Sequence, residues 1–112
     1  MTAVMNQPQR PDWSFLSNHT HVLHCISCWP DIRIRDIAVK VGITERAVQR
    51  ILVELERTGY LKRQRVGRQN HYRLETGVHL RHPLERHVEI GWLLAVLQSA
   101  NAAGEMSAQE PA

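Results

Sequence analysis

Histidine and cysteine residues, whose side chains can bind metal ions, occur together between residues 18 and 29. Four of them follow the helical spacing i, i+3, i+4, i+7, at His21, His24, Cys25 and Cys28. A helix over this stretch would project all four in the same direction, and soft divalent metals favour thiolate and imidazole ligands. Four groups on one straight stretch of helix cannot converge tetrahedrally on one ion without a second segment or subunit. We therefore interpret this face as an inert packing surface or a dimer contact, with a metal or thiol sensor as the alternative.

Basic residues, which can bind a polyanion, are concentrated in the middle of the chain. The chain has 112 residues and a net charge of +3. Residues 33–73 contain 11 Lys and Arg against 4 Asp and Glu, a net +7, whereas the balance is −1 before this stretch and −3 after it. Such a block of positive charge is the expected footprint of a surface that binds nucleic acid. A solvated basic face is the alternative interpretation.

A helix is needed to present these basic side chains, and the apolar residues predict where it lies. The helical spacing i, i+3, i+4, i+7 is followed by Val48, Ile51, Leu52 and Leu55. This pattern predicts a helix over residues 44–58 with one buried stripe. The opposite side then carries Arg46, Arg50, Val53 and Arg57, with Gln49 at its edge. The helix thus uses one face for folding and presents arginine and glutamine on the other.

A second predicted helix, over residues 34–41, comes directly before this one. It ends at Gly42, and a glycine at this position can take the left-handed conformation that closes a helix. Thr44 fits the N-cap of the following helix. Glu45 suits the positive end of that helix's dipole. The two helices are therefore expected to be joined by a tight turn.

A β-hairpin is predicted after the second of these helices, which ends at Gly59. Residues 60–66 form the first strand and residues 71–74 the returning strand, around a turn at residues 67–70. Residues 32–34 are expected to add a short third strand beside the hairpin.

The residues IRDIAVKVGITERAVQRILVELERTGYLKR, the GRQN turn and the HYRL that follows it make one continuous pattern from Ile34 to Leu74. This pattern resembles the winged helix-turn-helix domain of bacterial and archaeal regulators of the MarR and ArsR type. The resemblance implies that the second helix of the pair enters the major groove of DNA and that the hairpin, or wing, touches the backbone or minor groove. The predicted fold class is mainly α with a small β-hairpin wing, extended by a C-terminal dimerisation helix.

The predicted DNA-binding residues lie on the second helix and on the wing. They are Thr44, Glu45, Arg46, Gln49, Arg50, Arg63, Arg65, Arg68 and Asn70. The leading interpretation is a sequence-specific transcriptional regulator that binds double-stranded DNA. One alternative is a winged-helix module that binds protein. Because ArsR-type proteins include metal sensors, a metal- or thiol-responsive regulator is the other alternative.

A further helix is predicted over residues 18–29, with Ser17 or Asn18 as its cap. Its apolar face is expected to pack on Ile37, Val48 and Ile51. This face consists of Val22, Leu23, Ile26 and Trp29, with His19 nearby.

The last predicted helix starts around Pro83, which fits the first helical position, and runs to about Gln98. Residues 90–97 are apolar all round except at Gly91, and a soluble monomer of this size cannot cover such a helix on every side. We therefore expect a homodimer, and the alternative is a helix that completes its own core. The expected interface residues are Leu84, Val88, Ile90, Trp92, Leu93, Leu94, Val96 and Leu97.

The predicted organisation is a flexible N-terminus (1–12), the winged helix-turn-helix domain (13–77), the C-terminal helix (78–98) and a flexible tail (99–112). The chain contains no signal-peptide pattern and no apolar run of transmembrane length, so we expect a cytoplasmic protein without a membrane partner. No Gly-rich phosphate loop, HExxH motif or other enzyme signature is present, and no cofactor is expected. The residues do not identify an effector.

Overall fold

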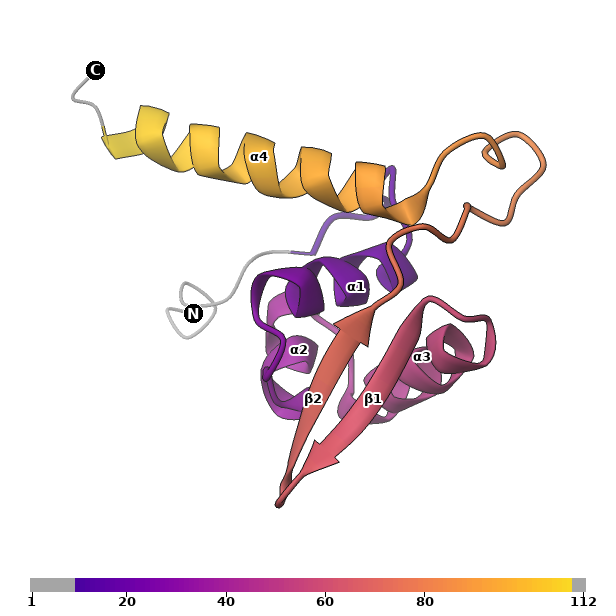
Figure 1. The fold of residues 1–112 in the computed structure, drawn as a ribbon. Coiled ribbons are helices and arrows are strands. Elements are labelled where there is room, and N and C mark those ends of the chain that lie inside the picture. The colour runs from indigo at the N-terminus through magenta and orange to yellow at the C-terminus, as the bar shows by residue number, and fades with distance from the viewer. Residues whose placement is uncertain (1–9, 110–112) are drawn as a thin grey trace. The chain divides into compact units, whose positions relative to one another are not determined.

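Four helices and one antiparallel hairpin make up residues 10–109, the part of the chain that the computed structural model describes, with side chains up to Ser99. In order they are α1 (Asn18–Cys28), α2 (Ile34–Val41), α3 (Glu45–Arg57), β1 (Leu61–Val66), β2 (Gln69–Leu74) and α4 (Ile90–Gln109) (Figure 1). The chain divides into two compact units, one up to Leu74 and the other from Glu75 onward. This content confirms the predicted winged helix-turn-helix fold class with an added C-terminal helix.

The α2–turn–α3 unit follows the predicted capping pattern. Gly42 has a φ of 85°, and its N–H donates to the Ala38 carbonyl at 2.8 Å, which closes α2. The Thr44 hydroxyl accepts a hydrogen bond from the Ala47 N–H at 3.0 Å and caps α3. The stripe predicted to be buried is buried throughout, at Val48, Ile51, Leu52 and Leu55.

Helix α1 packs on the helix-turn-helix, as predicted. The Ser17 hydroxyl caps it by accepting from the Thr20 N–H at 3.4 Å. The buried side chains of this unit include Val22, Leu23 and Ile26 from α1, together with Ile37, Ala38 and the α3 stripe. Helix α1 packs against both α2 and α3.

Two residues of the predicted helix over residues 18–29 lie elsewhere than predicted, Trp29 and Cys25. Trp29 follows the last helical residue and is 48% exposed, so it does not belong to the core face. Cys25 is only 6% exposed and lies among the core residues instead of on the opposite face. The cause is that the buried stripe of α1 is wide enough to include position 25 beside Val22 and Ile26.

The wing hairpin pairs Leu61 with Leu74 at one end and Val66 with Gln69 at the other. Its turn is therefore two residues long, Gly67 and Arg68, and the predicted four-residue turn at 67–70 is wrong. Gly67 has a φ of 62°, which is the conformation that the first position of a type II′ hairpin turn requires. This geometry lets Gln69 and Asn70 join the strand.

The third strand predicted at residues 32–34 is also wrong, because the described sheet has two strands and Ile34 already belongs to α2. One backbone hydrogen bond takes its place, from the Tyr72 N–H to the Pro30 carbonyl at 3.1 Å. Beside it the His71 Nδ1 lies 2.6 Å from the Asp31 carboxylate. These two contacts attach β2 to the connection between α1 and α2.

The helix predicted from Pro83 starts later, at Ile90, and continues past the predicted end at Gln98 to Gln109. Residues before it form a loop instead, because Leu80 N–H donates to the Val88 carbonyl at 2.9 Å and Ile90 N–H to the Val78 carbonyl at 2.8 Å. At the helix start Gly91 packs directly on Thr76, where a Cβ would lie 2.6 Å from the Thr76 Cβ.

Two predicted flexible segments lie partly beyond the described residues. Positions 1–9 of the N-terminal segment and 110–112 of the tail are outside them, whereas residues 99–109 are helical.

Candidate nucleic-acid interface

The outward face of α3, which we define as Arg46, Gln49, Arg50, Val53 and Arg57, is exposed along its whole length. The buried stripe of α3 packs on the core and fixes the rotation of the helix about its axis, so these residues on the opposite side face the solvent. Within the described residues, the side chains of Arg46 and Gln49 form no hydrogen bond or ion pair, and Arg50 lies near Glu54 without pairing with it. These groups are therefore available to an external partner.

The N-terminal end of α3 holds two further predicted site residues, Thr44 and Glu45, both exposed. The Thr44 hydroxyl is already used as the helix cap. The Glu45 carboxylate lies in the first turn, where it interacts favourably with the helix dipole. Both residues position the start of the helix.

Two basic residues at this end were not among the predicted DNA-binding residues. The Arg10 guanidinium donates to the Gly42 carbonyl at 3.2 Å, so the segment before α1 lies against the helix-turn-helix turn. Arg10 and the exposed Arg35 line a cleft of about 660 Å³ that also includes Thr44 and Ala47. Arg35 lay within the basic block of the sequence, but no pattern in the sequence places Arg10 beside residue 42.

The wing, a hairpin of two strands, carries exposed basic side chains. Arg65 and Arg68 are exposed and form no hydrogen bond or ion pair within the described residues, and Arg68 occupies the turn itself. In Figure 1 the turn of the hairpin extends beyond α2 and α3. The arginines of the turn are therefore accessible to an external partner.

Arg63 and Asn70, also predicted to bind DNA, are half-buried and lie against other protein groups. Arg63 donates two hydrogen bonds to the Glu56 carboxylate, from Nε at 3.2 Å and Nη2 at 2.8 Å. The hydrogen bonds to Glu56 raise the pKa of Arg63 and so stabilise its charged form. Burial raises the pKa of the Tyr72 hydroxyl, and the neighbouring Asn70 side chain partly offsets this by lowering it. Arg63 thus joins β1 to α3, a structural role that the sequence did not reveal.

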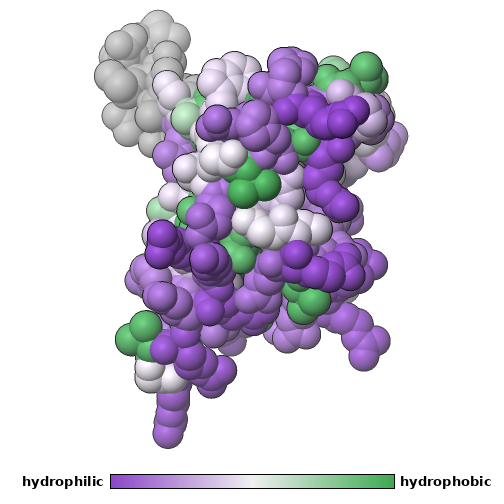
Figure 2. Space-filling model, turned by 45° about the vertical axis from the view of Figure 1, so that its right-hand side comes forward, coloured by the Kyte–Doolittle hydropathy of each residue, from purple (hydrophilic) through white to green (hydrophobic). Residues whose placement is uncertain are grey.

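The face of the molecule seen in Figure 2 is mainly hydrophilic in its lower part. Figure 2 shows purple side chains over most of its lower part, at the height where Figure 1 places the helix-turn-helix and the wing, with isolated hydrophobic residues among them. An exposed, arginine-bearing helix beside an arginine-bearing hairpin is an arrangement suited to binding DNA.

Comparison with known families agrees with this geometry. Residues 17–66 match the sequence profile of the MarR family. This part of the chain is similar to the winged helix-turn-helix domain of the MarR family. The match covers α1, α2, α3 and β1, and it supports a DNA-binding regulator of transcription rather than an enzyme. No curated protein and no solved structure matches the chain.

The histidine and cysteine residues of α1 in this MarR-like domain do not share one exposed face. Burial raises the pKa of the Cys25 thiol, and Cys28 is half-buried. Burial also lowers the pKa of His21, and the nearby His24 and Arg10 act in the same direction. Among the described side chains, those of residues 10–99, no three His, Cys, Asp or Glu groups are placed to hold a metal ion. Residues 10–109 include no helix long and apolar enough to cross a membrane.

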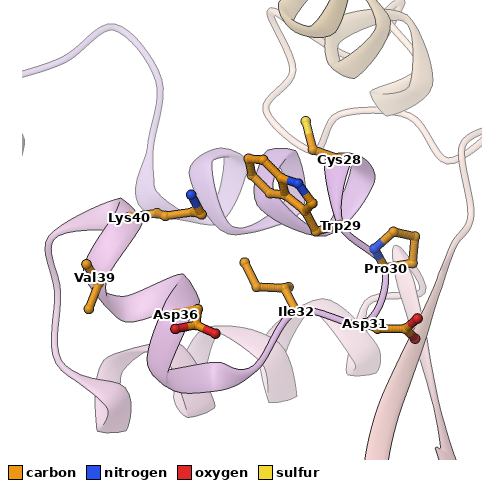
Figure 3. A pocket seen from close by; sticks show the side chains of 8 residues that line it. All are labelled: Cys28, Trp29, Pro30, Asp31, Ile32, Asp36, Val39 and Lys40. Carbon is orange, nitrogen blue, oxygen red and sulfur yellow. The ribbon is translucent and has the colours of Figure 1, made fainter.

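A second cleft of the MarR-like domain, of about 720 Å³, lies where α1 meets α2 (Figure 3). Its apolar lining includes Trp29, Ile32 and Val39, and the Lys40 ammonium lies 4.4 Å from the centre of the Trp29 ring. Figure 3 shows the Asp31 carboxylate pointing away from the other side chains, toward the strand on which it meets His71. No residue of α3 lines this cleft, so it is separate from the candidate DNA-binding face.

Proposed function

We propose that this MarR-like protein is a sequence-specific transcriptional regulator that binds double-stranded DNA as a homodimer. The observation that carries the proposal is the outward face of α3, whose orientation is fixed by the buried stripe. Its arginine and glutamine side chains are exposed and form no hydrogen bond or ion pair with the part of the chain that the structure describes. The family match supports DNA binding and transcription regulation in general. The residue roles below are our proposal.

The outward face has the chemistry to read bases in the major groove. Arginine can donate two hydrogen bonds to guanine, and glutamine can pair with adenine, each good pair discriminating by about 1–3 kcal/mol. Arg46, Gln49 and Arg50 lie in the first half of α3, the end that Thr44 and Glu45 position. We assign these three residues to base contacts.

The wing has the chemistry to bind the sugar–phosphate backbone or the minor groove. Among the described residues, Arg65 and Arg68 have no fixed protein partner. Contacts of such charged side chains with phosphates add affinity with little sequence information. Arg10 and Arg35 at the turn extend this basic surface. Arg63 donates to the Glu56 carboxylate and so attaches strand β1 of the wing to α3.

A second copy of the chain would cover the exposed side of α4. Trp92 is 62% exposed and Val96, one turn later, is 42% exposed, whereas Ile90 and Leu94 are buried. The proposed interface therefore centres on Trp92 and Val96, with the half-buried Leu93 and Leu97 beside them. Symmetric pairing would place two α3 helices about one helical turn apart on DNA, which predicts a palindromic site.

The main alternative, a winged helix that binds protein, is less compatible with the outward face of α3. Protein interfaces are depleted of charge at their centres, and this face holds three arginines and one exposed apolar residue. A metal- or thiol-responsive regulator receives no support from the buried Cys25. The proposal includes no cofactor, and it places the protein in the cytoplasm, together with the DNA that it regulates.

Selection from a pool of random-sequence duplexes tests the proposal. The purified 112-residue chain should retain duplexes that share an inverted repeat, with the two halves centred about one helical turn apart. Recovery of random sequences, with weak binding that disappears at moderate salt, would contradict sequence-specific recognition.

A further inference from the structure

Val53 is the one exposed apolar residue on α3, and it lies within the outward face. Its side chain is 55% exposed, although the helix buries four other apolar residues. Arg50 precedes it by three positions, Gln49 by four, and Arg57 follows by four, so its neighbours along the face are all polar. A branched apolar side chain is thus held in the middle of the proposed DNA-reading surface.

The fold of the domain does not account for this valine. The stripe that packs α3 on the core is complete with Val48, Ile51, Leu52 and Leu55, and Val53 lies on the opposite side. Valine also favours the helical conformation less than alanine, lysine or glutamate does. A single apolar residue surrounded by charges is moreover too small a patch to attract a protein partner.

The major groove offers one apolar group, the C5-methyl of thymine. The valine side chain is suited to contact it, because its χ1 angle has one strongly preferred value in a helix and its methyl groups are therefore already fixed in place. Residues three or four apart on a helix are separated by about 5–6 Å, and base pairs by about 3.4 Å. A base that contacts Val53 would then lie one or two base pairs from those read by Gln49 and Arg50.

We propose that Val53 contacts the C5-methyl group of a thymine in each half-site and so specifies that base. The inference rests on the proposed DNA-binding function and deepens it, because it assigns an apolar base contact to a face otherwise composed of hydrogen-bonding groups. Gln49 and Arg50 read neighbouring bases through hydrogen bonds. Val53, which lies between these two residues and Arg57 along the helix, recognises the methyl group of a thymine.

Replacing thymine by deoxyuridine removes only the methyl group and tests the contact directly. The probe is a synthetic duplex carrying the site selected from the random pool, with each thymine replaced in turn. The wild-type protein should bind about fourfold more weakly per half-site when one particular thymine is replaced, which corresponds to losing one buried methyl group. The Val53→Ala protein should bind the thymine and deoxyuridine duplexes equally at that position.

Val39→Ala is the matched control, since Val39 is an exposed valine on α2 and lies outside the outward face of α3. This variant should keep the wild-type preference for thymine. Wild-type binding that is specific but indifferent to every replacement would overturn the Val53 contact and leave the proposed function intact. So would a Val53→Ala protein, folded by circular dichroism, that keeps the full preference. Failure of the wild-type protein to select any sequence would instead overturn the proposed function itself.

Discussion

His19 on α1 lies 2.6 Å from Glu54 on α3, with its Nε2 against the carboxylate Oε1, and so links the supporting helix to the proposed DNA-reading helix. This hydrogen bond lowers the pKa of Glu54 below its ordinary value of 4.5. A carboxyl group whose pKa is lower in the folded state stabilises the fold above its unfolded-state pKa, and this contribution is lost as the pH falls through the folded-state value.

The first prediction therefore concerns stability in acid. Below pH 4.5 the wild-type protein should lose thermal stability more steeply than the Glu54→Gln variant, which cannot titrate at this position. Melting curves followed by circular dichroism from about pH 6 to about pH 3 measure the difference. If the melting temperatures of the two proteins fall equally with pH, the His19–Glu54 pair does not contribute to the pH dependence of stability.

The second prediction separates two arginines of the same strand. Arg63→Ala should lower the free energy of unfolding by about 1 kcal/mol, because it removes the two hydrogen bonds to Glu56 from a partly exposed pair. Arg65→Ala should leave the melting temperature unchanged and weaken DNA binding, since Arg65 has no protein partner among the described residues. If the two variants show the reverse pattern, the assignment of Arg63 to structure and Arg65 to DNA is wrong.

The third prediction concerns the turn of the wing. If Arg68 neutralises one phosphate in each half-site, Arg68→Ala should reduce the slope of log K against log salt by about one per half-site. Arg81→Ala is the control, because Arg81 is exposed but lies outside the basic stretch. A slope that Arg68→Ala leaves unchanged would remove Arg68 from the interface.

The fourth prediction concerns the exposed side of α4. Burial of a large apolar side chain contributes about 1.5–3 kcal/mol, so two or three per chain would sustain a dimer at low micromolar concentration or better (about 8 kcal/mol). Trp92→Lys or Val96→Asp should yield monomers that keep their helicity and bind DNA weakly. Sedimentation of the wild-type protein at about ten times that concentration checks the premise, and a 12.9 kDa monomer would contradict both the dimer and the palindromic site.

The sequence predicted the helix-turn-helix almost to the residue, because local physics determines it. Gly42, Thr44 and the α3 stripe each act within one or two turns of helix, and such patterns are visible in one chain. Contacts distant in sequence were missed for the same reason. The pair between Arg63 and Glu56 depends on how β1 folds back on α3, which no spacing rule states.

Errors occurred where a local signal competed with backbone pairing. Pro83 suits a helix start, but the hydrogen bonds that pair residues 78–80 with 88–90 make a loop there instead. The prediction of a third strand at residues 32–34 was wrong because α2 already begins at Ile34. A single backbone hydrogen bond, from the Tyr72 N–H to the Pro30 carbonyl, joins the wing to the α1–α2 connection instead. The dimer and the DNA contacts remain predictions.

The most direct test of DNA reading by α3 is the ratio of specific to nonspecific affinity in Arg50→Ala. Fluorescence anisotropy on the selected duplex and on a scrambled duplex of equal length gives both affinities at one salt concentration. We predict that Arg50→Ala binds the selected duplex roughly 5- to 150-fold more weakly per half-site, equivalent to one lost base pairing of about 1–3 kcal/mol, with a much smaller change on the scrambled duplex. A folded Arg50→Ala protein with the wild-type ratio would contradict the assignment of this helix as the reader of the site.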